Sequence, residues 1–260
     1  MFSPPIRRLL KRTVRLCGYD VIRFDPVRYE QFDRQAAIEG KIVRCLIDGT
    51  EVCFFVADEE DIIQREHLRQ RFYEAEELEI VKQAFTGGTF LDVGANVGNH
   101  ALFAAMFLGA SRVVCVEPNP VAYGILRINI ALNGQQDKVT LLPVGLSDHR
   151  GMASIQIPPH NLGGGTLTRD VAGANIPLLS GDELLAESPI DFIKIDTEGM
   201  ELVVMNGLSE TIRRHRPAMF VEVEDRNVDG FLQMMGTFGY EIAKRYRRYN
   251  DNENILALPL

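Results

Sequence analysis

Short apolar segments alternate with amphipathic ones along most of the chain after residue 88. Five of these segments are apolar at nearly every position, as expected of strands that are buried on both faces. They are TFLDV (89–93), RVVCVE (112–117), KVTLLPV (138–144), DFIKID (191–196) and AMFVEVE (218–224). Amphipathic helices are predicted between them and after the last. The pattern therefore predicts a parallel sheet with helices on both faces.

Helical spacing of the apolar positions extends on both sides of the first strand. The helices that follow the first two strands are predicted over residues 100–109 and 120–132. Before the first strand, a charged segment with apolar positions at helical spacing predicts one helix over residues 60–85. The pair Gly87-Gly88 ends it.

Two segments depart from this pattern. Residues 41–56 alternate around Asp48-Gly49, which predicts a β-hairpin. After Gly239, two β-prone segments flank a polar turn at residues 250–253. We expect these segments to form a second hairpin, added antiparallel at one edge of the sheet.

The start of the chain is basic and amphipathic. Leucines and a valine alternate there with Arg7, Arg8, Lys11, Arg12 and Arg15. This pattern predicts a short helix, which either lies on an anionic membrane surface or packs as an ordinary solvated helix on the main domain. We divide the chain into an N-terminal extension (1–59) of helix and β-hairpin, and a main domain (60–260).

Composition narrows the class of protein. A net charge of −8, from 28 basic and 36 acidic residues, argues against a general nucleic-acid binder. No apolar stretch approaches the roughly 20 residues of a spanning helix, and the start lacks the apolar core of a secretory signal. Cys45 and Cys53 flank the first hairpin turn, but reduced thiols are favoured over a cross-strand disulfide. We expect a cytoplasmic protein, with peripheral contact to the inner membrane surface as an open alternative.

A glycine turn between the first strand and its helix is the main candidate ligand site. In Asp92-Val-Gly94-Ala-Asn-Val-Gly98, the glycines allow the backbone to approach a ligand, and the helix directs unpaired N–H groups toward it. Glu117 ends the next strand, where it could accept hydrogen bonds from both hydroxyls of a ribose. The turn lacks the middle glycine that a pyrophosphate needs, and Asp92 suits a cationic group. Both features favour S-adenosylmethionine over a dinucleotide.

Four segments resemble class I methyltransferases, and within these the FkbM family. They are FLDVGANVGNH (90–100), VVCVEPNP (113–120), VGLSD (144–148) and DFIKIDTEGMEL (191–202). The resemblance extends from about residue 73 to residue 258. It implies a Rossmann-like α/β fold, with a mostly parallel seven-stranded sheet, an antiparallel edge hairpin and helices on both faces.

The resemblance also implies a set of cofactor-binding residues. Those that would wrap the methionine part of S-adenosylmethionine are Asp92, Gly94, Ala95, Asn96 and Gly98. Glu117 would bind the ribose, and Ser147 or Asp148 would contact the adenine. We place Asn99 and Pro118, which adjoin these motifs, in the same predicted site.

A second polar cluster follows the fourth strand. Methyl transfer is an in-line displacement, and a hydroxyl acceptor is helped by a carboxylate that takes its proton. Asp196 is the first candidate for this role, then Glu198, then Glu222 at the end of the fifth strand. Alternatively, Asp196 pairs with Lys194 in a structural role. The three carboxylates could also gather around Mg²⁺, but acidic residues are common at strand ends, and we predict no bound metal.

A long insertion separates the third and fourth strands. Residues 149–180 contain one predicted extra strand at 153–157 and three consecutive glycines at 163–165. We expect a mobile loop here that covers the acceptor, with Asn161 and Thr166 donating to a polyol, or else a plain surface connection.

These observations favour an S-adenosylmethionine-dependent O-methyltransferase. Its acceptor would be a hydroxyl of a sugar, a glycan or glycolipid, or a polyketide-like product. The alternatives are an NAD(P)-dependent oxidoreductase, which shares the glycine turn and later acid, and a non-catalytic nucleoside-binding module. The sequence does not determine the oligomeric state.

Overall fold

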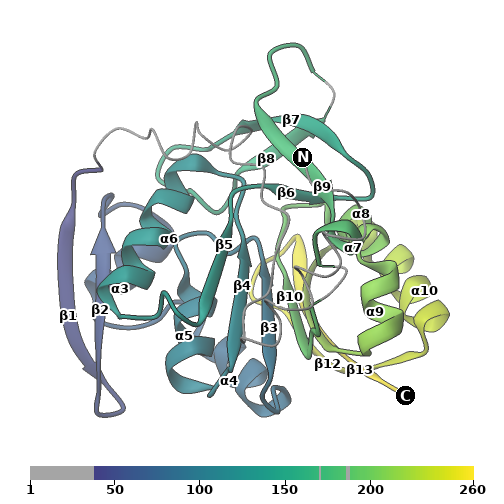
Figure 1. Ribbon diagram of the computed structural model, residues 1–260, viewed down its shortest axis with the longest axis horizontal. Helices are drawn as coiled ribbons and strands as arrows, with labels where there is room; N and C mark the ends of the chain where they lie inside the picture. Colours follow the sequence, from purple (N-terminus) through teal and green to yellow (C-terminus); the bar gives the residue numbers. More distant parts are fainter. Residues whose placement is uncertain (1–37, 170, 186–187) are drawn as a thin grey trace, which may run out of the picture.

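The computed structural model describes residues 38–169, 171–185 and 188–260, and its centre is a seven-stranded sheet (Figure 1). The strand order is β12-β13-β11-β10-β3-β4-β5. The strands are β3 (Thr89–Val93), β4 (Arg112–Val116), β5 (Val139–Leu142), β10 (Phe192–Ile195), β11 (Ala218–Glu224), β12 (Tyr240–Tyr246) and β13 (Asn252–Pro259). The strands β5, β4, β3, β10 and β11 run parallel to one another. The hairpin β12–β13 extends the sheet at its edge, where β13 pairs antiparallel with β11. The predicted fold class is confirmed.

Alternate residues of each strand enter two apolar layers. Phe90 and Phe192 stack on one face of the sheet, with ring centroids 5.0 Å apart, while Leu91 and Ile193 lie on the other face. Helices α4 (Ala75–Ala84), α5 (Asn99–Phe107) and α6 (Pro120–Leu132) cover the first face. The helices that cover the second face are α7 (Gly181–Leu185), α8 (Glu201–Gly207), α9 (Ser209–His215) and α10 (Val228–Phe238). In the described ranges, no helix is long and apolar enough to cross a bilayer.

The single helix predicted over 60–85 is wrong. The structure has two helices, α3 (Ile62–Leu68) and α4, because Gln70 and Glu74 adopt left-handed backbone conformations with φ of 64° and 58°. The break lets the Phe72 ring pack edge-on against Phe54 and Phe103, with centroids 5.2 and 5.4 Å away. Helical spacing cannot report such a break, because both helices bury apolar residues at similar intervals.

The N-terminal hairpin is present and packs on the main domain. It comprises β1 (Lys41–Ile47) and β2 (Thr50–Val56). The side chains of Asn129 on α6 and of its C-cap Asn133 accept hydrogen bonds from the β2 backbone, from Phe55 N at 2.7 Å and from Cys53 N at 2.9 Å. The hairpin and the main sheet therefore share one core. The predicted helix at the start of the chain, with its membrane contact, lies outside the described residues.

Three of the four cysteines can be compared with their prediction. Cys45, Cys53 and Cys115 are buried free thiols in the part of the chain that the structure describes. Cys45 pairs across the hairpin with Val52, so the two hairpin cysteines are not opposite each other.

The insertion contributes three strands to a second sheet, whereas we predicted one strand in it. The strands of this sheet are β6 (Gly145–Ser147), which precedes the insertion, β7 (Gly151–Gln156), β8 (Thr166–Arg169) and β9 (Ile176–Ser180), in the order β6-β9-β7-β8. This sheet lies across one end of the central sheet (Figure 1). Residues of both sheets line the same cleft, so the insertion builds one wall of it.

Candidate active site at the carboxyl ends of the central strands

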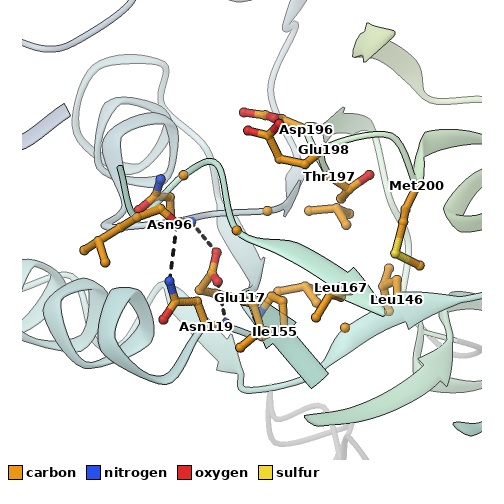
Figure 2. Close-up of a pocket in the computed structure, with 18 residues that line it drawn as sticks. Asn96, Glu117, Asn119, Leu146, Ile155, Leu167, Asp196, Thr197, Glu198 and Met200 are labelled. Atoms are coloured by element: carbon orange, nitrogen blue, oxygen red, sulfur yellow. Dashed lines mark hydrogen bonds between the residues drawn. The ribbon is translucent and has the colours of Figure 1, made fainter. Parts of the chain in front are cut away.

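A cleft opens where β3 lies between β4 and β10 (Figure 2). The chain runs from β3 to β4 on one side and reaches β10 only after the insertion on the other, and ligands of open α/β sheets bind at such points. The cleft opens to solvent, and its cavity volume is about 60 Å³. Its lining combines the ends of β3 and β4, the small sheet and the loop after β10.

The glycine turn after β3 is held against both neighbouring strands. Gly94 N and Ala95 N donate to Val116 O at 3.0 and 3.1 Å. The φ of Gly94 is 79°, and a Cβ there would lie 1.8 Å from Asp196 O. Only glycine fits this position, because the turn touches the backbone of the loop after β10.

Glu117 is fixed at the end of β4 by two backbone donors. Its Oε2 accepts from Asn96 N and its Oε1 from Asn119 N, both at 2.7 Å (Figure 2). Burial raises the pKa of Glu117 to about 7, although these hydrogen bonds act to lower it. Each carboxylate oxygen can accept a further hydrogen bond. This geometry suits two adjacent hydroxyls of a ribose.

Buried side-chain oxygen atoms near the turn suit a ligand that carries hydrogen-bond donors. Asp92 is fully buried, and its Oδ1 lies 3.6 Å from Lys194 Nζ, in an ion pair. Within the described residues, no donor comes within hydrogen-bond distance of Asp92 or of Asn96 Oδ1. Thr197 Oγ1 in the cleft lining has no partner there either. Unsatisfied buried acceptors are costly, so Asn96 Oδ1 and Thr197 Oγ1, whose residues line the cleft, fit the ammonium and hydroxyl groups of S-adenosylmethionine.

The opposite wall of the cleft is apolar and suits a flat base. Leu146, Ile155 and Leu167 project from the small sheet, and Met200 faces them from the loop after β10 (Figure 2). The glycine-rich loop also lines this cleft, whereas we expected it to cover the acceptor. Its Asn161 accepts from Gly164 N at 3.0 Å, within the loop itself.

Six predicted cofactor residues lie outside the cleft lining, namely Asp92, Ala95, Gly98, Asn99, Ser147 and Asp148. The Asn99 side chain instead accepts a hydrogen bond from Tyr73 N and donates one to Tyr73 O, each at 2.9 Å. Ser147 donates to Asp148, which also accepts from Arg169. The lining residues in this stretch are Gly145 and Leu146, because the short strand β6 turns its later residues away from the cleft.

Asp196, Glu198 and Glu222 come together as predicted. One carboxylate oxygen of each lies within 4.8 Å of the others. Figure 2 shows Asp196 and Glu198 pointing to the same side of the cleft. Lys194 Nζ donates to Asp196 Oδ2 at 3.2 Å and to Gly94 O at 3.1 Å. The structural pairing of Asp196 with Lys194 is therefore present beside the carboxylate cluster.

Ionising all three carboxylates together is unfavourable, because their negative charges repel one another at this short separation. Burial, followed by the charges of Asp196 and Glu224, raises the pKa of Glu198 to about 7. Burial and Asp196 raise the pKa of Glu222 to about 10, so this side chain is protonated at neutral pH. The cluster therefore holds one proton firmly and exchanges a second near neutrality. A divalent cation held by the same oxygens would displace these protons.

Glu74 is a neighbour of this cluster that the sequence did not indicate. Its Oε2 lies 3.1 Å from His100 Nε2, and its charge contributes to the raised pKa of Glu222. The adjacent Tyr73 hydroxyl contacts the Tyr249 hydroxyl of the edge hairpin. The break between α3 and α4 brings both residues to the site, and the sequence pattern predicted a continuous helix there.

The chain is similar to known methyltransferases in sequence and in fold. The methyltransferase FkbM domain matches residues 92–249. The hexuronic acid methyltransferase AglP of Haloferax volcanii is 25% identical over 213 residues, covering 79% of each chain. The methyltransferase sdnD of Sordaria araneosa is 27% identical over 155 residues, covering 46% of this chain and 60% of that protein. In fold, the chain is similar to the putative tRNA (m1A22) methyltransferase Sp1610 of Streptococcus pneumoniae, with a TM-score of 0.51, 12% identity and coverage of 72% and 70%.

Proposed function

Because the chain belongs to the FkbM methyltransferase family and uses S-adenosylmethionine, we propose that it methylates a hydroxyl group of a sugar or glycan acceptor. The observation that carries the proposal is the carboxylate cluster beside the cleft, which offers an acceptor for the hydroxyl proton. The similarity to a hexuronic acid methyltransferase supports a sugar over a polyketide-like product. Family membership decides against the oxidoreductase and the non-catalytic alternatives.

We assign the cofactor to the cleft by the chemistry of its lining. Glu117 would accept hydrogen bonds from both ribose hydroxyls, and the apolar wall at Leu146, Ile155 and Leu167 would flank the adenine. The unpartnered Asn96 Oδ1 would meet the methionine end, whereas Asp92 lies outside the lining and pairs with Lys194. When bound, the cofactor supplies an electrophilic methyl carbon on a positively charged sulfur.

Glu198 is the best placed of the three carboxylates to take the hydroxyl proton. Its pKa of about 7 makes it a base near neutral pH, while Glu222 already holds a proton there. Asp196 is held by Lys194 and accepts a hydrogen bond from Glu222, so its carboxylate has a fixed position from which to orient the acceptor hydroxyl. The hydroxyl oxygen would bond to the methyl carbon as the carbon–sulfur bond breaks, with that bond's electron pair left on the sulfur of a neutral thioether. The hydroxyl proton would pass to a Glu198 carboxylate oxygen.

Methyl-labelled S-adenosylmethionine and fractionated cell extract test the proposal. Mass spectrometry of the labelled material would identify the acceptor. We expect the label in a free sugar, a nucleotide sugar or a glycan, at one hydroxyl position. Label confined to nucleic acid, protein or non-carbohydrate products would contradict the proposed acceptor class.

A further inference from the structure

The glycine-rich loop is fixed over the cleft at the backbone of Leu162. Leu162 N donates to Asp61 Oδ2 at 2.9 Å, and Leu162 O accepts from Asn119 Nδ2 at 3.3 Å. Both backbone polar groups of Leu162 are thus held by side chains far away in the sequence. Asp61 and Asn119 are both buried.

Each of these two side chains also begins a helix. Asp61 Oδ1 accepts from Ile63 N and Gln64 N at the start of α3, at 3.1 and 3.0 Å. Asn119 Oδ1 accepts from Val121 N at the start of α6, at 3.0 Å. Each residue uses one terminal atom to cap its helix and the other to hold the loop. The loop therefore takes its position from two rigid elements.

The fixed loop meets the residues assigned to the cofactor. Leu162 and Gly163 line the cleft, and a Cβ on Gly163 would lie 2.7 Å from Asn96 Nδ2. Asn119 N also donates to Glu117, the proposed ribose ligand. A second, exposed contact between His160 and Asp58, at 2.9 Å, ties the outer side of the loop to the segment before α3.

We propose that Asp61 and Asn119 are positioning residues for S-adenosylmethionine, which hold the backbone N–H and C=O of Leu162 so that the loop closes the cofactor cleft. Asp61 lies outside the segment that matches the FkbM domain, so the N-terminal part of the chain contributes to cofactor binding. The inference rests on the proposed placement of the cofactor in this cleft.

Asp61→Asn separates the two roles of the side chain. The remaining side-chain oxygen can still cap α3. The new NH₂ group faces the Leu162 N–H, and because both are donors, the Leu162 N–H loses its hydrogen-bond acceptor. A buried donor without an acceptor costs enough to change affinity roughly 10-fold. We expect titration calorimetry to show about 10-fold weaker binding of S-adenosylmethionine, with kcat at saturating cofactor within about two-fold of wild type. Amide hydrogen exchange at residues 161–165 should accelerate without cofactor.

Asn119→Ser gives a second test if Asp61→Asn folds poorly. Serine keeps an N-cap acceptor and removes only the donor to Leu162 O, so a smaller loss of affinity, about 3-fold, is expected. Asp182→Asn is the matched control. Asp182 accepts from Glu210 N and Thr211 N at 2.9 and 2.8 Å on the other face of the sheet. This substitution should lower stability and leave cofactor affinity unchanged.

The outcomes separate this inference from the proposed function. Wild-type affinity in folded Asp61→Asn and Asn119→Ser, or an equal loss in Asp182→Asn, would overturn the positioning role while the wild type still binds cofactor. Failure of the wild type to bind S-adenosylmethionine would overturn the placement of the cofactor and this inference with it.

Discussion

Gly94 and Asp196 are in direct backbone contact, because a Cβ on Gly94 would lie 1.8 Å from the carbonyl oxygen of Asp196. Lys194 reinforces the contact, since its Nζ donates both to Gly94 O and to Asp196 Oδ2. The turn proposed to hold the methionine end and the loop proposed to hold the acceptor therefore move as one unit. A change in either should affect both.

Gly94→Ala tests this contact. The added methyl group would force the two backbones apart, and we expect loss of measurable S-adenosylmethionine binding. Gly109→Ala is the matched control, because Gly109 also has a positive φ of 67° but meets open space. Gly109→Ala should lower the free energy of unfolding only by the conformational penalty, about 1 to 2 kcal/mol. Gly94→Ala should lower it by at least about 2 kcal/mol more. Equal stabilities in urea denaturation, with cofactor binding retained, would show that the contact is unimportant.

The base assignment predicts a pH profile. Glu198 must be ionised to accept a proton and its pKa is about 7, so kcat/KM should rise with pH through a midpoint near 7. Glu198→Gln should lower kcat roughly 100- to 10,000-fold and remove the step. Glu224→Gln serves as the control. The Glu224 charge raises the pKa of Glu198, so its loss should move the midpoint to lower pH without removing it. An unchanged step in Glu198→Gln would rule out this base.

The raised pKa of Glu222 predicts that folding stability depends on pH. Its pKa is about 10 when folded and near the ordinary value of about 4.3 when unfolded, so the folded state holds the extra proton between these values. Its contribution to stability is complete below pH 4 and declines as pH rises, at most by about 1.4 kcal/mol per pH unit. Glu222→Gln removes this decline. Urea denaturation at pH 7 and 9 should show a smaller loss in the variant than in the wild type, and parallel losses would contradict the prediction.

Arg248 joins the edge hairpin to α4. It donates to Glu76 at 2.6 Å and to the fully buried Glu77 at 2.5 Å. Arg248→Met leaves the Glu77 charge buried without its cation, and we expect a loss of about 3 kcal/mol. The double variant Arg248→Met/Glu77→Gln should recover at least half of that in urea denaturation. No recovery would mean that Arg248 acts through packing rather than through its charge.

Local signals explain the parts of the site that were predictable. Strands buried on both faces give continuous apolar runs, and the glycine turn with Glu117 follows two of them in a fixed order. The positions of Gly94, Glu117 and Asp196 at one edge follow from parallel strand order alone. These residues were found because a few neighbours in the sequence determine where each lies.

The unpredicted parts depend on contacts between distant segments. Glu74 reaches the site because Asn99 holds the Tyr73 backbone, 26 residues away in the sequence. Leu162 lies over the cleft because Asp61 accepts its N–H across 101 residues. Neither pairing leaves a periodic pattern, and Asp61 by itself is an ordinary helix cap. The four-stranded sheet that includes the insertion was missed for the same reason, since its strands are short and pair out of sequence order.

The central claim is methyl transfer from S-adenosylmethionine to a carbohydrate hydroxyl, and the most direct test is to identify the atom that receives the label. The purified protein would be incubated with ¹³C-methyl S-adenosylmethionine and the sugar fraction that accepts label, and the product examined by NMR. The account predicts one ¹³C methyl ether on a ring or chain hydroxyl, formed by the wild type and not detectably by Glu198→Gln. A label on nitrogen or carbon, or an equal yield from Glu198→Gln, would contradict it.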